Sequence, residues 1–175
     1  MPIQKPFNLT KWIEENRELL KPPVGNKNLY IDSGDYIVMI VAGPNARKDY
    51  HYNETEELFY QIEGDIILKI QQDGKMVEIP INEGEMFLLP AKIPHSPVRA
   101  KNSIGLVIEK KRESHHQDGL LWYSETENIL LYEEYFHLTD IEKDFLPVFK
   151  KFYSNKDLRT CPVSGEIMDI DDRFI

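Results

Sequence analysis

Apolar residues follow a helical spacing at both ends of the chain and a period of two between them. The apolar positions near the N-terminus are Leu9, Trp12, Ile13, Leu19 and Leu20. Their spacing predicts a helix over residues 8–20, with Asn8 or Thr10 as the N-cap and the two prolines that follow as its end. From about residue 139 a second apolar stripe predicts a C-terminal helix.

Between these helices, short apolar runs alternate with turns. The runs read LYI, YIVMIVA, LFYQI, DIILKI, MVEIPI, EMFLLP, GLVIE and LLWY, separated by glycine, asparagine, aspartate or proline. Asp73-Gly74 lies between two of them and offers the positive φ angles of a tight hairpin turn. Many short strands with little helix between them predict an all-β fold, a jelly-roll barrel with flanking N-terminal and C-terminal helices.

The length of 175 residues fits a single domain. No internal repeat or low-complexity linker divides the chain, so we expect both helical ends to pack on one β core. The expected domain spans residues 1–175, with a core at about 28–123 and a C-terminal appendage at about 124–175.

The net charge and the cysteine content limit which classes of partner and which cellular compartment we expect. A formal net charge of -9 and a pI near 5.1 argue against nucleic acid and against an anionic membrane surface as partners. Cys161 is the single cysteine, and the first residues contain no apolar run like a signal peptide. No stretch reaches the roughly 18 apolar residues of a membrane-spanning helix. We therefore expect a cytoplasmic protein without nucleic-acid or membrane partners.

Two segments contain residue types that bind metals. The first has Gly43, Asp49, His51, Glu57 and Gly64 in that order, and the second has Gly84, Pro90 and His95. Both segments resemble the two cupin motifs, except that Asp49 stands where the first motif has a histidine and Lys92 where the second has a glycine. The resemblance implies a cupin barrel that holds one metal ion through His51, Glu57 and His95.

The pattern around Glu57 supports a metal site independently of that resemblance. Strand alternation in ELFYQI places Glu57, Phe59 and Gln61 on one face, which in a barrel faces the interior. A buried carboxylate needs a positive partner, and a divalent cation also held by two imidazoles meets that need. Two histidines and one carboxylate leave coordination positions open, as in non-haem Fe(II) oxygenases. The alternative is a cupin that has lost its metal.

The remaining histidines have a plainer explanation. His115 and His116 lie in the polar stretch ESHHQDG, which predicts a solvated loop, and His137 lies near a strand end. A single histidine in a β protein is more often hydrogen-bonded or exposed than a metal ligand. We therefore do not expect these three histidines to bind the metal.

Several longer stretches carry a more specific resemblance. They are LKPPVGN, VAGPNARKDYH, EELFYQIEGD, EGEMFLLPAKIPHSPVR, LVIEKKR and DGLLWY. From about residue 7 to residue 123 the chain resembles the 3-hydroxyanthranilate 3,4-dioxygenase family. This implies an enzyme with one Fe(II) per chain that opens the ring of 3-hydroxyanthranilate with O2. The product, 2-amino-3-carboxymuconate semialdehyde, cyclises to quinolinate, which implies a place in tryptophan catabolism by the kynurenine pathway or in de novo NAD synthesis.

The same resemblance implies roles for polar residues near the metal. Arg47 and Arg99 match the family's clamp on the substrate carboxylate, a task that suits a planar guanidinium. Glu109 matches an acidic residue beside the substrate's hydroxyl and amino groups, where it can accept a proton. We expect these three to act in catalysis, and Glu57 and Asn26 to join them in binding the substrate. Asp49, like Asn26, matches a polar position near the site.

Each of these residues also has an alternative explanation. Arg47 could be a surface arginine in a Pro-Asn loop, and Arg99 could pair with an acidic neighbour. Glu109 is followed by two lysines and could be a solvated strand end. Asp49 could cap a turn through hydrogen bonds to the backbone.

One part of the family pattern is missing. Short microbial and fungal members carry two Cys-x-x-Cys pairs that hold a second iron near the C-terminus. Here Ser124 and Glu127 stand at the first pair, and Cys161 is followed by Ser164 at the second. One thiolate cannot form a four-sulfur site. We therefore expect no second, rubredoxin-like iron, and a C-terminal region held by apolar packing.

Two other functions stay open. A different metal-dependent cupin enzyme would use the same fold, although an arginine pair beside the metal favours an anionic substrate. A non-catalytic cupin that binds a small aromatic acid is the second alternative. For the dioxygenase, the partners are the aromatic acid and O2, and the family resemblance suggests a homodimer, the commonest soluble assembly.

Overall fold

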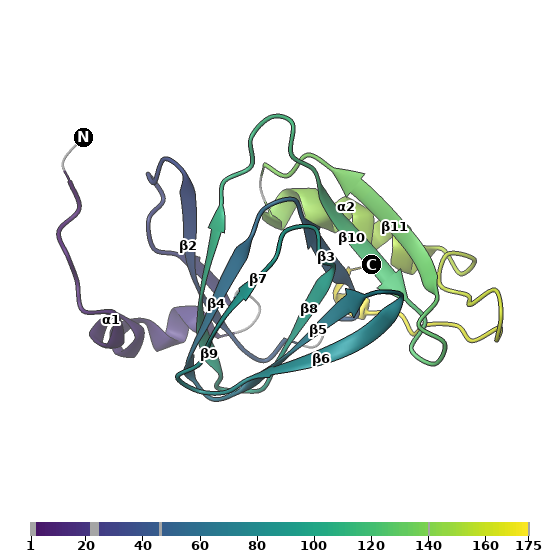
Figure 1. Ribbon diagram of the computed structural model, residues 1–175, viewed down its shortest axis with the longest axis horizontal. Coiled ribbons are helices and arrows are strands. Elements are labelled where there is room, and N and C mark those ends of the chain that lie inside the picture. Colours follow the sequence, from purple (N-terminus) through teal and green to yellow (C-terminus); the bar gives the residue numbers. More distant parts are fainter. Residues whose placement is uncertain (1–2, 22–24, 46, 140, 175) are drawn as a thin grey trace.

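The chain forms two antiparallel β-sheets that face each other around a barrel interior (Figure 1). The computed structural model describes residues 3–21, 25–45, 47–139 and 141–174, without the side chains of residues 141 and 142. The five-stranded sheet has the order β1 (Asn26–Asn28), β2 (Tyr36–Ala42), β9 (Ile104–Lys110), β4 (Glu57–Glu63) and β7 (Met86–Leu89). The six-stranded sheet has the order β11 (Leu130–Phe136), β10 (Asp118–Tyr123), β3 (Tyr50–Asn53), β8 (His95–Arg99), β5 (Ile66–Gln72) and β6 (Lys75–Ile81).

The strand order within the two sheets identifies a jelly roll. Strands β2-β9-β4-β7 of one sheet and β3-β8-β5-β6 of the other interleave along the chain, as two Greek keys require. The expected hairpin joins β5 to β6, where Asp73 and Gly74 have φ angles of 51° and 74° and Gln72 pairs with Lys75. The predicted all-β fold and its barrel are therefore confirmed.

The inner face of the five-stranded sheet changes from apolar to polar along its strands. Val107 and Phe59 are paired across β9 and β4 and belong to the apolar cluster that fills the barrel. Two residues away in the same strands, Glu109 pairs with Glu57. Because residues two apart share a face, both carboxylates point into the barrel. The barrel interior is thus apolar in one part and acidic beside it.

The N-terminal helix covers part of the outer face of the same sheet. Helix α1 (Leu9–Asn16) begins where the Asn8 side chain accepts a hydrogen bond of 2.9 Å from the Lys11 amide, and it continues as the 3-10 turn η1 (Arg17–Leu20). Ile13 and Leu20 are buried against Ile40 of β2 and its neighbours. The expected helix over residues 8–20 is present, with its last turn tightened.

Two strands differ from expectation. The strand expected in LYI lies three residues earlier, as β1, so only the amide of Leu29 pairs with the next strand. Strand β11 was not expected, because Glu133 and Glu134 interrupt its apolar pattern. It pairs with β10 and extends the six-stranded sheet past residue 123. The 3-10 turn η2 (Asp172–Phe174) follows near the C-terminus.

The C-terminal helix α2 (Ile141–Ser154) packs on strands β10 and β11. Trp122 of β10 is fully buried and stacks on Phe152 of α2, with ring centroids 4.2 Å apart. Phe145 and Phe149 belong to the same apolar cluster, so apolar packing holds this region as expected. None of the described helices is long and apolar enough to cross a membrane.

Candidate metal centre

Two histidines lie next to each other on neighbouring strands of the six-stranded sheet. His51 of β3 and His95 of β8 occupy directly paired positions, and their ring centroids are 5.4 Å apart. Glu57 begins β4 in the other sheet and is 7% exposed. One ligand atom from each of these three residues lies within 4.8 Å of the other two. The fold therefore brings together the three residues expected to bind a metal.

The charges in this cluster fit a divalent cation. Glu57 Oε2 lies 3.1 Å from His95 Nε2, yet it has no hydrogen bond from any described residue. Burial raises the pKa of Glu57, but the two histidines outweigh burial and the net shift is downward. Burial lowers the pKa of His95, but Glu57 reverses that shift. A buried carboxylate that favours positive charge, beside two imidazoles, is a donor set that a divalent metal accepts.

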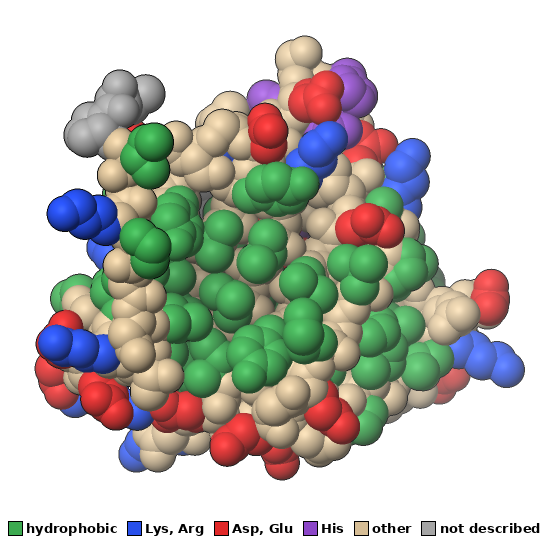
Figure 2. Space-filling model, turned by 60° about the vertical axis from the view of Figure 1, so that its left-hand side comes forward, with side chains coloured by type: hydrophobic (Ala, Val, Ile, Leu, Met, Phe, Trp, Pro, Cys, Tyr) green, Lys and Arg blue, Asp and Glu red, His purple; other side chains and the backbone are tan. Residues whose placement is uncertain are grey.

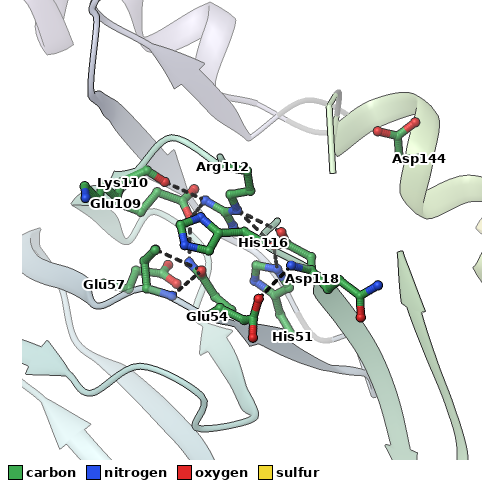
Figure 3. A network of polar contacts seen from close by, with 12 residues as sticks. His51, Glu54, Glu57, Glu109, Lys110, Arg112, His116, Asp118 and Asp144 are labelled. Carbon is green, nitrogen blue, oxygen red and sulfur yellow. Dashed lines mark hydrogen bonds and ion pairs between the residues drawn. The ribbon is translucent and has the colours of Figure 1, made fainter. Parts of the chain in front are cut away.

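Each histidine is oriented by a hydrogen bond on one ring nitrogen. His95 Nδ1 lies 3.1 Å from the carbonyl oxygen of Ile93. His51 Nε2 lies 2.7 Å from Oδ2 of Asp118, which is fully buried at the start of β10 (Figure 3). Such partners fix the tautomer and the ring orientation of a metal-binding histidine and leave its other nitrogen for the metal.

Asp118 is itself held by an arginine. Arg112 donates from Nε to Asp118 Oδ1 at 2.8 Å and from Nη2 to Asp118 Oδ2 at 2.6 Å (Figure 3). Burial alone would raise the pKa of Asp118, but the hydrogen bonds from Arg112 and His51 lower it to about 2. Asp118 is therefore a carboxylate throughout the neutral range, and His51 always has an anionic partner.

Glu109 is buried beside the metal-binding cluster. It is 3% exposed, and its Oε2 accepts hydrogen bonds from Arg112 Nη1 at 2.6 Å and from Asn53 Nδ2 at 3.1 Å. Burial and the neighbouring carboxylate of Glu57 raise the pKa of Glu109 to about 7, against the opposing effect of Arg112. The alternative of a solvated strand end is wrong, because the strand turns this side chain inward.

Arg99 is buried without an anionic partner among the described residues. It is 3% exposed, its Nη1 donates to the amide oxygen of Gln61 at 3.3 Å, and its Nε has no hydrogen bond. Burial lowers the pKa of Arg99 to about 10, and Glu57 is near enough to oppose that shift. The alternative of a pair with an acidic neighbour is therefore not seen, and one edge of the guanidinium stays available.

Arg47 and Asp49 lie in the segment before β3. Arg47 Nε is 3.3 Å from Oδ1 of Asp49, whose buried carboxylate accepts no hydrogen bond from the described residues. The turn-cap explanation of Asp49 is therefore wrong. The Arg47 guanidinium also lies over two rings of helix α2, 5.8 Å from the centroid of Phe145 and 5.4 Å from that of Phe149. Arg47 is partly buried rather than on the open surface.

The remaining candidates lie away from this cluster. Asn26 is exposed at the start of β1 and has no hydrogen bond to another described residue of the site, so its role stays a prediction. His115 is exposed in the loop after β9. His137 Nδ1 lies 3.0 Å from the carbonyl oxygen of His116. These three histidines are not among the residues that gather around Glu57.

Four further residues contact the cluster or the neighbouring Glu109 and were not singled out from the sequence. Asp118 and Phe145 contact His51, and Asn53 and Arg112 contact Glu109. Arg112 follows two lysines and looks like the end of a solvated basic run. Asp118 precedes a glycine and looks like a turn residue. Phe145 lies in a distant helix, yet its ring is 5.4 Å from that of His51. Only the stretches LVIEKKR and DGLLWY, which resemble the family, pointed to this region.

Comparison with known proteins agrees with these features. The chain matches the 3-hydroxyanthranilic acid dioxygenase family over residues 1–153. It is 54% identical over 169 residues to a 3-hydroxyanthranilate 3,4-dioxygenase of Xanthomonas campestris pv. campestris (strain 8004), covering 97% of this chain and 95% of that protein. A protein of the same name from Neurospora crassa is 46% identical over 167 residues, with 95% and 92% covered.

A solved cupin-2 domain containing protein from Shewanella frigidimarina is 20% identical, covers 57% of this chain and 92% of its own, and has a TM-score of 0.45. The family match spans most of the chain, and the relatives match it almost from end to end. This chain therefore belongs to the 3-hydroxyanthranilic acid dioxygenase family.

Proposed function

We propose that the chain is an Fe(II)-dependent dioxygenase that opens the ring of 3-hydroxyanthranilate with O2 to give 2-amino-3-carboxymuconate semialdehyde, the precursor of quinolinate. The observation that carries the proposal is a cluster of His51, Glu57 and His95 near a buried Arg99 with an unpaired donor. The cluster suits a metal, and Arg99 suits an anionic substrate. The names of the relatives point to the same substrate.

The three clustered residues would hold the iron. When bound, the ion would supply one centre at which the neighbouring hydroxyl and amino groups of the substrate and O2 can meet. The fixed orientations of His51 and His95 would keep two ligands in place while the open positions change occupants.

Arg99 and Arg47 would bind the substrate carboxylate. Arg99 has the free edge for it, and a carboxylate there would give the buried guanidinium the anion that it lacks. Arg47 is held by Asp49 and by the rings of α2 and would approach the carboxylate from the segment before β3. Two arginines would favour an anionic substrate over a neutral one.

Glu109 would accept the proton of the substrate hydroxyl. A pKa near 7 suits a group that takes up and returns a proton at neutral pH. Both hydrogen bonds that it accepts from the described residues end on Oε2, so Oε1 is the oxygen that would face the substrate.

The test is anaerobic loading of the apo-protein with Fe(II), followed by 3-hydroxyanthranilate and O2. Oxygen uptake and the absorbance of the ring-opened product are recorded together, and we expect one O2 consumed per product formed. His95→Ala should abolish both signals. The matched control is His115→Ala, which removes an exposed imidazole outside the cluster and should keep wild-type turnover.

The other outcomes separate the alternatives. Tight binding of 3-hydroxyanthranilate without turnover would point to a cupin that recognises the acid but does not cleave it. Iron uptake without binding of this acid would point to another metal-dependent cupin enzyme. Equal turnover by the wild type and by His95→Ala would refute the metal site itself.

We also propose that the chain forms a homodimer through the outer face of the five-stranded sheet. Figure 2 shows apolar side chains gathered on the side of the molecule where this sheet faces outward. The strand register places Leu58, Leu88 and Ile108 in one row and Tyr60, Met86 and Leu106 in the next. Leu88 and Met86 are 52% and 63% exposed. A contiguous exposed apolar patch of this kind marks a protein interface.

The dimer is tested by light scattering on a size-exclusion column. The wild type should have twice the mass of the 20.6 kDa chain, and Leu88→Glu should have the mass of one chain. The matched control is Met76→Glu in β6, an exposed apolar residue of the other sheet, which should stay dimeric. A monomeric wild type would refute the proposal.

A further inference from the structure

Arg112 lies between two buried carboxylates, one from each sheet. It belongs to the segment 111–117, which leads from the end of β9 in the five-stranded sheet to the start of β10 in the six-stranded sheet. Its side chain is 3% exposed. It contacts Glu109 on one side and Asp118 on the other, and Figure 3 shows the guanidinium at the centre of this network.

These contacts form a continuous path from the proposed proton acceptor to a proposed metal ligand. Glu109 Oε2 is 2.6 Å from Arg112 Nη1, and Arg112 Nη2 is 2.6 Å from Asp118 Oδ2. The same Asp118 oxygen is 2.7 Å from His51 Nε2. Every nitrogen of the guanidinium donates at least one hydrogen bond. Nε and Nη2 donate to Asp118, and Nη1 donates to Glu109 and to the carbonyl oxygen of Lys110. These hydrogen bonds therefore fix the orientation of the Arg112 guanidinium.

The geometry requires a planar fork. Asp118 accepts hydrogen bonds from two neighbouring nitrogens on one edge of the guanidinium, Nε and Nη2, while Nη1 points in another direction, to Glu109. A lysine ammonium could neutralise the two carboxylates, but it could not hold both at fixed angles. The effect of the positive charge of Arg112 can thus be separated by experiment from the effect of its fixed hydrogen-bond directions.

We propose that Arg112 is a positioning residue that sets the His51 ring and the Glu109 carboxylate relative to each other, acting on His51 through Asp118. This inference deepens the proposed function, since it rests on the metal site and on the role of Glu109. The hydrogen bond that Asp118 accepts from His51 fixes the ring that would bind the metal, and Arg112 fixes Asp118.

A purely structural role is the competing explanation. Arg112 links Glu109 of the five-stranded sheet to Asp118 of the six-stranded sheet. An arginine that only linked the sheets would affect folding without affecting the metal centre. Metal affinity and the spectrum of a bound metal distinguish the two roles, because both report the ligand geometry without any turnover.

The experiment uses Co(II) as the probe, titrated into the full-length apo-protein without substrate. The dissociation constant is measured by competition with a chelator, and the visible absorption of Co(II) reports the ligand geometry. Arg112→Met should weaken Co(II) binding about 10- to 100-fold, the usual effect of losing a partner of a metal ligand. Arg112→Lys keeps the positive charge but not the planar fork, and it should weaken Co(II) binding less than Arg112→Met does, with a changed spectrum.

The matched control is Arg17→Met. Arg17 also forms a two-point contact with a carboxylate, that of Glu63, at 2.9 and 2.7 Å, but at the surface and outside the site. Its Co(II) affinity and spectrum should equal those of the wild type. Thermal unfolding of each apo-protein shows that the variants compared are folded.

A double variant tests whether Arg112 acts through Asp118. Asp118→Asn should weaken Co(II) binding by itself, and Arg112→Lys combined with Asp118→Asn should be no weaker than Asp118→Asn alone. Independent, additive losses would overturn the path through Asp118. Wild-type affinity and spectrum in folded Arg112→Lys would overturn the positioning role altogether.

The result is separable from the proposed enzyme activity. A wild type that binds Co(II) but never cleaves 3-hydroxyanthranilate would refute the substrate proposal, while the Co(II) comparison would still decide the role of Arg112. Full turnover together with unchanged Co(II) binding in Arg112→Lys would refute the inference and leave the proposed function standing.

Discussion

Arg99 and Arg112 both have a buried side chain near Glu57, but the surroundings of the two guanidinium groups differ. Arg99 is 3% exposed as a whole residue, and the side chain of Arg112 is 3% exposed. Arg112 has two carboxylates as partners, and their effect on its pKa outweighs burial, so that the pKa is raised. Arg99 has the neutral amide of Gln61, and burial lowers its pKa to about 10.

The difference divides the site into two parts. In the completed part, Arg112 already has its anionic partners, and in the open part, Arg99 has none. A buried cation with matching anions is already stabilised, so Arg112 belongs to the folded framework. A buried cation without an anion costs free energy, and the protein retains Arg99 in that state although Gln61 cannot neutralise it. An arginine kept in this way is suited to an anion that arrives later, such as the substrate carboxylate.

The largest expected effect is a loss of stability when Arg112, in the completed part of the site, is replaced. Arg112→Met would leave Glu109 and Asp118 buried without their cation, and the free energy of unfolding should fall by about 3–5 kcal/mol. Urea denaturation of the apo-protein measures it. The surface variant Arg17→Met should lose at most about 1 kcal/mol. Equal losses of unfolding free energy in the two variants would show that the buried ion pairs of Arg112 stabilise the fold no more than the exposed pair of Arg17.

Replacing Arg99, in the open part of the site, by methionine should lower activity and not stability. Arg99→Met removes a charge that has no partner in the free protein, so the free energy of unfolding should stay the same or rise. The kcat/KM for 3-hydroxyanthranilate should fall about 100-fold, as expected when a charge-assisted contact to the substrate worth about 3 kcal/mol is lost. A destabilised Arg99→Met with normal kinetics would contradict the comparison.

The acidity of Glu109 adds a dependence of stability on pH in the metal-free protein. Its folded pKa of about 7 lies above its ordinary value of 4.5, so the unfolded chain releases this proton first as pH rises. The stabilisation is complete below about pH 4.5 and is lost as pH approaches 7, by at most about 3 kcal/mol. Glu57, Arg112 and Asp118 surround this group and stay charged in that window. His95, whose pKa Glu57 raises, adds a slope of the same sign, and His51, whose pKa burial lowers, adds one of the opposite sign.

The pH effect is measured by urea denaturation between pH 5 and pH 8. Glu109→Gln should reduce the slope over this range, because it cannot release a proton, and leave only the contribution of His51 and His95. Glu113→Gln, which changes an exposed carboxylate in the following loop, is the control and should keep the wild-type slope. A slope as steep in Glu109→Gln as in the wild type would assign the titration to another group.

The smallest effect is expected at Arg47, which is intermediate between the two arginines. Its guanidinium is shared between Asp49 and the rings of α2. Phe149→Leu keeps an apolar side chain but removes a cation–π contact worth about 0.5–1 kcal/mol. The KM for 3-hydroxyanthranilate should rise about two- to fivefold with kcat unchanged. An unchanged KM would show that α2 does not position Arg47.

The β rhythm and the three residues that cluster, His51, Glu57 and His95, could be predicted because each leaves a local signal. Alternation in ELFYQI placed Glu57, Phe59 and Gln61 on one face, and all three are buried. The departure at Lys92 also becomes clear, since this residue has a φ of 68°, a conformation that favours the glycine of the motif. Strand β11 left no such signal, because its glutamates hide the apolar positions.

The residues that surround the three clustered side chains could not be predicted from local patterns. Arg112 looks solvated in its sequence context, and only the crossing from one sheet to the other places it between Glu109 and Asp118. Phe145 is remote from His51 along the chain but next to it in space. The single domain, the cytoplasmic location and the role of Asn26 stay predictions.

The sequence by itself determined the strands, the hairpin, the flanking helices and the identity of the three clustered residues, because periodicity, turn residues and motif order act over short distances. Only the tertiary structure decided which charges meet. Burial and pairing depend on which strands become neighbours, and β3, β4, β8 and β9 are joined across two sheets by contacts that no local pattern encodes. That is why Arg112 became a paired framework residue and Arg99 an unpaired one.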